Sequence, residues 1–282
     1  MKLHITDEFS PLKDVVVCWG SNIPKYEDYA KDDPEYIKYH KRTWNKDLLI
    51  KQQESFFKAL EKYSVRLHFL KTKPNLIWQM YTRDTAFVVR DQLYFTHLRA
   101  FKERLGEMEE LAKLLQALGI TTTQELKTGT IEGGDVIVDK QGILVGNGGR
   151  TQAATISELL EYETGRKLFL GEHVMHLDTR LTLLPRNYAL IISEAFSQED
   201  IAFLESRYKL LHVLPEEALD LGTNVFMVNP ETVFSPLQNE RINEMLKKEG
   251  FNVEKIDYTE PIALGGSFRC TTLPLVRDAS IY

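Results

Sequence analysis

The sequence of 282 residues contains only two cysteines and no long apolar run. Two cysteines cannot build a disulfide framework, and this scarcity indicates a reducing environment. No stretch approaches the roughly 18–20 apolar residues that span a bilayer, and the opening MKLHITDEFS lacks the apolar core of a secretory signal. We therefore predict a cytoplasmic protein without a membrane partner.

Positive charge is also in deficit. The 35 lysines and arginines are outnumbered by 41 aspartates and glutamates, which gives a formal net charge of −6. Proteins that bind nucleic acid normally carry a basic face, so we predict no nucleic-acid partner. G-x-G-x-x-G and P-loop motifs are absent, as are the C-x-x-C and H-x-x-x-H spacings of zinc sites. We predict neither an organic cofactor nor a metal.

What the sequence does contain is a repeat. Four segments share the order apolar strand, turn, second strand and helix, and they begin at Arg83, Gly134, Leu177 and Thr223. A further strand at Leu12, followed by a long helical stretch over 43–63, begins the first repeat. The period of roughly 45–55 residues favours radial stacking over a doubly wound sheet. We predict one α/β domain over 1–282, built as a propeller of ββαβ units.

The helices of these repeats are recognised by their apolar spacing. Leu105, Met108, Leu111 and Leu115 follow the i, i+3, i+4 pattern of an amphipathic helix. Ser197, with acidic residues after it, predicts the start of another helix. The segment 21–46 is polar, rich in tyrosine and poor in aliphatic residues, which leaves two alternatives: a lid over a site or a plain surface excursion.

A polar residue opens the first strand of four repeats, namely Asp84, Asp135, Asp178 and Asn224. Cys270 follows Asn224 by about one period and falls in the same phase. Repeats arranged around an axis bring equivalent positions together at one end. The repeat therefore predicts a ring of carboxylates around one thiol.

Five motifs in order resemble those of the guanidine-modifying enzymes: YTRD (81–84), EGGDV (132–136), GRT (149–151), HLDT (176–179) and GGSFRC (265–270). This superfamily comprises the arginine deiminases, the dimethylarginine dimethylaminohydrolases and the amidinotransferases. Its five-bladed α/β propeller, or pentein, fold agrees with the repeat. The resemblance extends over nearly the whole chain.

The resemblance implies a catalytic set. Cys270 matches the nucleophile, His176 the general acid/base, and Glu132 the carboxylate that orients the histidine. A thiolate attacks the central carbon of a guanidinium, the histidine protonates the departing amine, and water then releases a ureido product from an amidino-cysteine. Cys18 lies in an apolar strand and is interpreted as a packing residue.

The resemblance also implies substrate-binding residues. Asp84 and Asp178 match the pair that holds the guanidinium, because paired carboxylates fix its plane. Arg150 matches an arginine that often holds a substrate carboxylate, with a scaffold role as the equal alternative. Asp135 either binds substrate or braces its strand, and Arg83 is favoured as a structural partner of the carboxylates.

Three further alternatives concern the site. Carboxylates should raise the pKa of a nearby thiol, so we expect the cationic substrate to favour the thiolate, with Arg269 as a rival source of positive charge. EGGD could be only a tight turn whose glycines supply positive φ. Cys270, His176 and acidic residues could in principle bind zinc, although no zinc spacing supports it.

The leading function is therefore a hydrolase or deiminase that acts on the guanidino group of arginine or an arginine derivative. An amidinotransferase is the alternative, and a non-catalytic binding propeller is less favoured because those members lack the cysteine and histidine. The expected partner is a small-molecule guanidino substrate, and a homodimer is expected from family analogy alone.

Overall fold

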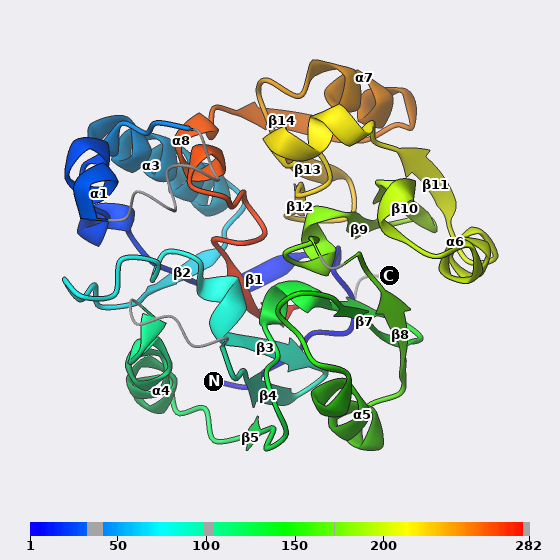
Figure 1. Cartoon of the computed structure of the whole chain (residues 1–282), viewed down its shortest axis with the longest axis horizontal. Coiled ribbons are helices and arrows are strands. Elements are labelled where there is room, and N and C mark those ends of the chain that lie inside the picture. The colour runs from blue at the N-terminus through cyan, green and yellow to red at the C-terminus, as the bar shows by residue number, and fades with distance from the viewer. Residues whose placement is uncertain (33–41, 99–103, 172, 279–282) are drawn as a thin grey trace.

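The computed structural model describes residues 1–32, 42–98, 104–171 and 173–278. In these residues, fifteen strands form five three-stranded sheets arranged in a ring (Figure 1). Every sheet repeats one topology: the first two strands are antiparallel, a helix follows, and the third strand returns parallel to the second. The predicted five-bladed α/β propeller of ββαβ units is confirmed.

One blade contains β15 (Leu273–Arg277), β1 (Leu12–Val17) and β2 (Arg66–Phe69), with α3 (Lys46–Lys62) between β1 and β2. The next contains β3 (Ala86–Val89), β4 (Gln92–Phe95), α4 (Glu107–Ala117) and β5 (Thr123–Glu125). The third contains β6 (Val136–Asp139), β7 (Gly142–Asn147), α5 (Ala153–Tyr162) and β8 (Gly165–Phe169).

The fourth blade contains β9 (Leu181–Leu184), β10 (Tyr188–Ile191), α6 (Gln198–Glu205) and β11 (Lys209–His212). The fifth contains β12 (Phe226–Met227), β13 (Thr232–Pro236), α7 (Glu240–Lys248) and β14 (Asn252–Ile256), and α8 (Thr259–Ala263) follows it. Ser197 caps α6 by accepting a hydrogen bond from the Asp200 amide, which confirms the helix start predicted there.

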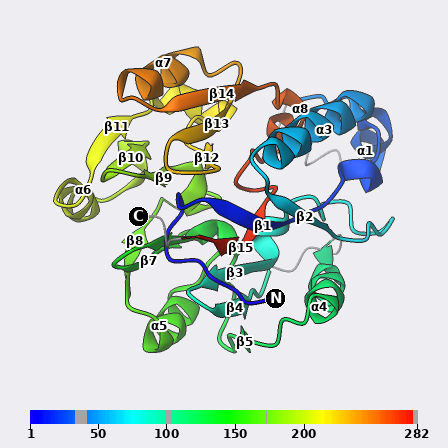
Figure 2. The ribbon, with the colours of Figure 1, turned by 180° about the vertical axis from the view of Figure 1, so that it is seen from behind.

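Two sequence predictions need correction. The strand at Leu12 is the second strand of its blade, because the first strand, β15, comes from the other end of the chain (Figure 2). Leu105 does not belong to the buried face of α4: it is 65% exposed, whereas Leu111 and Leu115 are buried. Gly106 adopts a left-handed φ of 100° and is the N-cap of α4, so the helix begins at Glu107, after Leu105.

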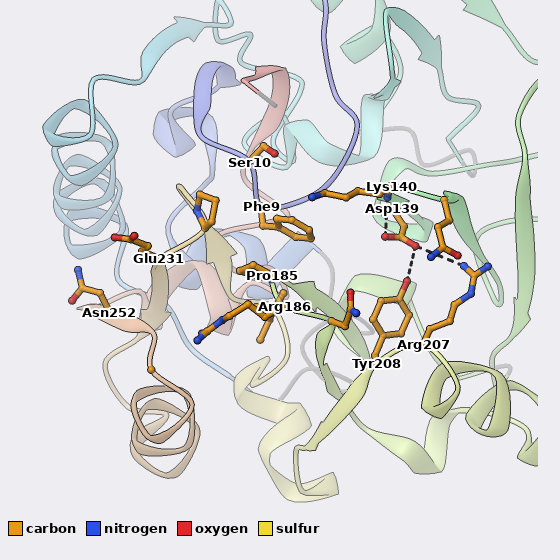
Figure 3. Close-up of a pocket in the computed structure, with 15 residues that line it drawn as sticks. Phe9, Ser10, Asp139, Lys140, Pro185, Arg186, Arg207, Tyr208, Glu231 and Asn252 are labelled. Atoms are coloured by element: carbon orange, nitrogen blue, oxygen red, sulfur yellow. Dashed lines mark hydrogen bonds and ion pairs between the residues drawn. The ribbon is translucent and has the colours of Figure 1, made fainter. Parts of the chain in front are cut away.

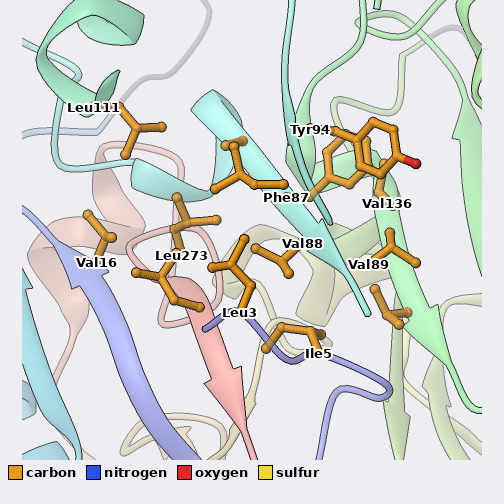
Figure 4. Packing of buried hydrophobic residues seen from close by; sticks show 14 of the residues in the cluster. Leu3, Ile5, Val16, Phe87, Val88, Val89, Tyr94, Leu111, Val136 and Leu273 are labelled. Carbon is orange, nitrogen blue, oxygen red and sulfur yellow. The ribbon is translucent and has the colours of Figure 1, made fainter. Parts of the chain in front are cut away.

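The core lies between the sheets because the inner strands are apolar along their whole length. All four residues of β3 are buried. Around it, Leu3 and Ile5 of the N-terminal segment, Val16 of β1 and Leu273 of β15 pack into one cluster with Phe87 (Figure 4). Strands covered on both faces are typical of apolar runs without alternation.

Single 3₁₀ turns precede the first strands of three blades. They are η2 (Thr82–Thr85), η4 (Gly133–Asp135) and η5 (Leu177–Thr179), and η4 contacts both of the others. The polar residues predicted at the head of the strands therefore lie in these turns rather than in the strands. We call this end of the first strands the site end.

At the opposite end, the first and second strands of four blades are joined by hairpin turns. Three of these turns and the segment around Phe9 border a cavity of about 740 Å³ (Figure 3). Its lining residues include Phe9, Lys140, Arg186, Tyr208 and Glu231. We call this end the hairpin end.

The segment predicted as a lid or surface excursion contains η1 (Gly20–Asn22) and α1 (Tyr26–Asp32), and its residues 33–41 lie outside the described ranges. The rings of Tyr26 and Tyr29 pack against Trp44, with centroid distances of 5.1 and 5.7 Å. None of the helices in the described ranges has the length and apolar character that a membrane span needs.

Candidate active site

The site end brings together five residues singled out in the sequence. Asp84 comes from η2, Glu132 directly precedes η4, His176 directly precedes η5, Asp178 belongs to η5, and Cys270 lies in the turn before β15. All five are buried. Charged groups are seldom buried unless they are paired or functional, so their gathering at one end defines the candidate site.

His176 lies between two carboxylates. Its Nε2 is 2.7 Å from Glu132 Oε2, and its Nδ1 is 3.7 Å from Asp84 Oδ1. Burial lowers the pKa of His176, but the charges of Asp84, Asp135 and Glu132, with the hydrogen bond to Glu132, more than offset it and raise this pKa to about 10. Burial raises the pKa of Glu132, yet the histidine brings it down to about 2. The pair is therefore an imidazolium and a carboxylate at neutral pH.

The two aspartates share one arrangement. Asp84 Oδ2 accepts a hydrogen bond from Arg104 Nη1 at 2.8 Å, and Asp178 Oδ2 accepts one from Arg269 Nη1 at 2.8 Å. The other oxygen of each, Oδ1, is buried and has no hydrogen-bond partner among the described residues. Buried acceptors without partners are costly, so the two Oδ1 atoms are suited to accept N–H groups of a ligand.

Cys270 lies beside this pair and is only 4% exposed. Its Sγ is 3.6 Å from Asn224 Oδ1 and 3.9 Å from Asp178 Oδ2. Burial, followed by the charges of Asp178 and Asp84, raises the pKa of the thiol well above its usual value, although Arg269 acts in the opposite direction. The predicted effect of the carboxylates on the thiol is thus present in the structure, and the unliganded site favours the protonated thiol.

Asp135 has both oxygens occupied within the protein. Its Oδ2 accepts from the Thr151 hydroxyl at 2.6 Å, and its Oδ1 accepts from the Leu177 amide at 2.8 Å. Burial raises its pKa to about 7. These contacts favour the bracing alternative, because Asp135 ties the turn after His176 to η4 and has no comparable oxygen left for a ligand.

Arg150 and Arg83, whose roles the sequence left as alternatives, contact different parts of the site. Arg150 is half-buried, and its Nη1 is 3.3 Å from both oxygens of Glu132. Arg83 donates its Nε to the main-chain carbonyl of Arg269 at 3.4 Å. Within the described ranges, no carboxylate lies at ion-pair distance from Arg83, so its immediate partner is the cysteine loop rather than the carboxylates that the sequence suggested.

The EGGD motif is not the positive-φ turn considered from the sequence. Gly133 and Gly134 are absent from the residues with positive φ. Their role is close approach: a Cβ at Gly133 would lie 2.1 Å from the carbonyl oxygen of Arg83, and one at Gly134 would lie 2.6 Å from His176 Nδ1. The glycines thus let η2, η4 and the histidine pack together.

Three charged residues of the site were missed. Arg104 is buried and pairs with Glu107 at 2.9 Å as well as with Asp84, and Glu8 pairs with Arg269 at 2.9 Å. The i, i+3 spacing of Arg104 and Glu107 was a weak signal, since it is common on helix surfaces. For Glu8 the sequence carries no signal, because its partner Arg269 is at the other end of the chain.

One metal-ligand geometry is present. Asp84, Glu132 and His176 each offer a ligand atom, and these atoms all lie within 4.8 Å of one another. Cys270 does not belong to this group, unlike in the zinc alternative considered from the sequence. A metal needs a neutral imidazole, whereas the raised pKa of His176, about 10, favours the proton.

Comparisons with known proteins agree with the fold and the motifs. A family model described as arginine deiminase matches residues 188–277, and one described as RNA-editing substrate-binding complex 5 protein matches residues 40–177. The matches do not overlap, and each contains part of the site: the first Cys270, the second Asp84, Glu132 and His176.

The uncharacterized protein YkgA of Bacillus subtilis is 32% identical to this chain, over 96% of this chain and 94% of its own length. The N(G),N(G)-dimethylarginine dimethylaminohydrolase of Pseudomonas aeruginosa is 22% identical, over 79% of this chain and 87% of its own. The crystal structure of the N-terminal domain of ArgZ, an arginine dihydrolase from cyanobacteria, aligns with a TM-score of 0.81 at 20% identity, covering 94% of this chain and 97% of that one. The chain belongs to the pentein superfamily of guanidine-modifying enzymes.

Proposed function

We propose that the protein is a cysteine-dependent hydrolase of the guanidino group of arginine or an arginine derivative. The observation that carries this proposal is a pair of buried carboxylate oxygens, Asp84 Oδ1 and Asp178 Oδ1, which accept no hydrogen bond from the described residues and belong to the site that holds the Cys270 thiol. Two anionic acceptors suit a planar cation with several N–H donors, which is the chemistry of a guanidinium.

The reaction begins with binding. The guanidinium donates to Asp84 and Asp178, which fixes its plane and presents its central carbon to Sγ. Its positive charge opposes the carboxylates that raise the pKa of Cys270, so the thiol releases its proton to solvent as the substrate binds and the thiolate becomes available. The enzyme thereby keeps its nucleophile protonated until a cation arrives.

Two covalent steps follow. The thiolate forms a C–S bond to the central carbon, His176 donates its proton to the departing amine, and the C–N bond breaks to leave an amidino-cysteine. The neutral imidazole then takes a proton from water, whose oxygen attacks the same carbon. The C–S bond breaks, releasing the ureido product and returning the thiol, and Glu132 holds the imidazole in position throughout.

A product assay on the purified protein tests the proposal. Arginine, methylarginines, agmatine and guanidinoacetate are offered with and without an amine acceptor, and Cys270→Ala is the control. Ureido product with ammonia or an alkylamine, lost in the variant, supports the hydrolase. Product formed only with an amine acceptor would instead assign an amidinotransferase, and no turnover of any guanidino compound would overturn the proposal.

Two added measurements complete the assay. Turnover that survives dialysis against a chelator is expected, whereas its loss and recovery with one divalent cation would assign a metal to Asp84, Glu132 and His176. Light scattering of the active protein tests the expected homodimer, which a monomeric mass would overturn.

A further inference from the structure

A buried chain of charges leads from Asp178 to the N-terminal segment. Arg269 donates its Nη1 to Asp178 at 2.8 Å and its Nη2 to Glu8 at 2.9 Å. All three side chains are buried. Glu8 Oε1 also accepts from the Val138 amide at 3.1 Å, which fixes the carboxylate in place. Glu8 is thus joined to the candidate site through a single guanidinium.

Two more buried arginines surround Glu8. Arg83 and Arg277 act on it through their charges, and together with Arg269 they lower its pKa to about 2, although burial alone would raise it. Arg277 donates to two main-chain carbonyls and Arg83 to one. Within the described ranges, neither has a carboxylate at ion-pair distance. Asp7, also buried, acts on Arg277 through its charge but accepts its own hydrogen bonds from neighbouring residues.

The consequence for a cationic ligand follows from the signs. Three buried guanidinium groups, those of Arg269, Arg83 and Arg277, lie among three buried carboxylates, those of Glu8, Asp178 and Asp7, so their formal charges cancel. Without the charge of Glu8 this group would carry a net positive charge, and an arriving cation would meet that excess beside Asp178. In a buried site such unscreened charges act strongly.

We propose that Glu8 is a positioning residue for guanidinium binding: it compensates Arg269, so that Asp178 keeps both a negative charge and a free oxygen for the substrate. This inference rests on the proposed function, because it takes Asp178 as a substrate ligand. Glu8 does not touch the reacting atoms and acts through Arg269. The outer carboxylate Glu107 stands in the same relation to Arg104 and Asp84.

The proposal predicts two opposite effects of one substitution. Glu8→Gln keeps the shape of the side chain and the acceptor for the Val138 amide, but it removes the charge. Substrate binding weakens because Arg269 is no longer offset. The unliganded thiol becomes more reactive, because the same excess positive charge favours the thiolate. A substitution that only loosened the packing near Asp178 would not couple the two effects in this way.

Steady-state kinetics give the first readout. With the guanidino compound that the wild type turns over, Glu8→Gln should raise KM by about 10- to 100-fold while kcat changes by less than about fivefold, as for the loss of one buried charge pair. Glu8→Asp keeps the charge and should stay within about threefold of wild type. The matched control is Glu163→Gln: Glu163 is also buried and bound by an arginine, Arg90, but lies at the end of α5 away from the site, and its kinetics should be unchanged.

Alkylation of the unliganded protein gives a readout without turnover. Iodoacetamide at pH 8 should label Cys270 several-fold faster in Glu8→Gln than in wild type, while Cys18, buried in the core, stays unlabelled. Labelling of both cysteines would report opening of the fold instead. Guanidinium ion should change the rate of Cys270 labelling, and the concentration that gives half of its full effect should rise in Glu8→Gln.

These readouts separate the two proposals. If no guanidino compound is turned over, the proposed function fails, and the guanidinium titration of Cys270 labelling still decides the role of Glu8. An unchanged KM, labelling rate and half-effect concentration of guanidinium in folded Glu8→Gln would overturn that role. If Glu8→Gln does not fold, Arg83→Gln decides instead: removing one positive charge should slow Cys270 labelling and leave KM no higher than in wild type, and faster labelling would overturn the proposal.

Discussion

The two ends of the first strands differ in how they hold charge. At the site end, His176, Asp178 and Cys270 are buried, and each charged group is fixed by a named partner. At the hairpin end, Lys140, Arg186 and Glu231 border a cavity of about 740 Å³ and are exposed (Figure 3). The volume of a cavity therefore does not by itself identify a functional site. The pKa shifts are largest and the ion pairs strongest where water is excluded, which is at the site end.

Local structure explains the difference. At the site end, 3₁₀ turns pack against one another and carry their polar side chains inward. At the hairpin end, the β9–β10 turn presents Arg186 and Asn187 to solvent, with positive φ values of 60° and 57° in a turn closed by a hydrogen bond from the Tyr188 amide to the Pro185 carbonyl. Arg186 lies over the Phe251 ring at 4.4 Å and Lys140 over the Phe9 ring at 5.4 Å, so these cations contribute surface packing.

The largest effect is expected from the two cysteines, which separate chemistry from packing. Cys270→Ser should lower kcat by at least about three orders of magnitude, because a hydroxyl is a far weaker nucleophile than a thiolate. Cys18→Ala should lower stability but leave kcat within about threefold. Initial rates of product formation measure both. Activity retained in Cys270→Ser would remove the chemical distinction between the two ends.

The second test compares aspartates at the two ends. Asp178→Asn and Asp84→Asn should each lower kcat/KM by about 100-fold, since each loses a charge-assisted acceptor for the substrate. Asp139→Asn is the matched control: Asp139 lines the hairpin-end cavity and accepts from the Tyr208 hydroxyl at 2.7 Å. Its kcat/KM should stay within about twofold of wild type. Equal losses at both ends would contradict the comparison.

The third test uses pH and stability. The folded-state pKa of His176, about 10, lies above its ordinary value of 6.5. Its protonation therefore contributes stability that is complete below about pH 6.5 and is lost as the pH rises to about 10. Urea midpoints between pH 6 and 10 should fall for wild type, with an advantage over His176→Gln on the order of a few kcal/mol at pH 6 that shrinks by pH 10. Parallel curves for the two proteins would refute this account.

The smallest effect is expected at the cavity itself. Arg186→Ala removes two exposed cation–π contacts, with Tyr188 and Phe251, and Lys140→Ala removes one, so the free energy of unfolding should change by less than about 1 kcal/mol in each variant. Their kinetics and the pH dependence of their urea midpoints should match wild type. A change of tenfold or more in kcat/KM would mean that the hairpin end communicates with the site, and the contrast between the ends would need revision.

The repeat explains which parts of the site could be predicted. Asp84, Asp178 and Cys270 share one phase of a repeated unit, so a ring of blades must bring them to one end, as the structure shows. Phase could not distinguish Asp135 from the other two, because the distinction lies in which oxygens accept from Thr151 and Leu177. Such contacts depend on tertiary packing rather than on spacing.

Other features were out of reach for a different reason. Glu8 and Arg269 meet only because β15 joins β1 in one sheet, and a repeat that appeared to begin at Leu12 hid that pairing. Arg104 follows the second strand of its blade, where its i, i+3 spacing to Glu107 is only a weak signal for a buried arginine. The strand pairing that closes a ring joins residues far apart in the sequence, so the local pattern of apolar and polar residues carries little information about it.

The pairing of β15 with β1 also bears on how the protein matures during synthesis. Strand β1 leaves the ribosome early, but its antiparallel neighbour is made after the other four blades, together with Cys270 in the turn before it. Those four blades can assemble in chain order, whereas the ring and the thiol's surroundings are completed only when β15 has been made. A chain terminated before β15 therefore lacks the strand that closes the ring, and the proposed thiol chemistry cannot begin until that strand is in place.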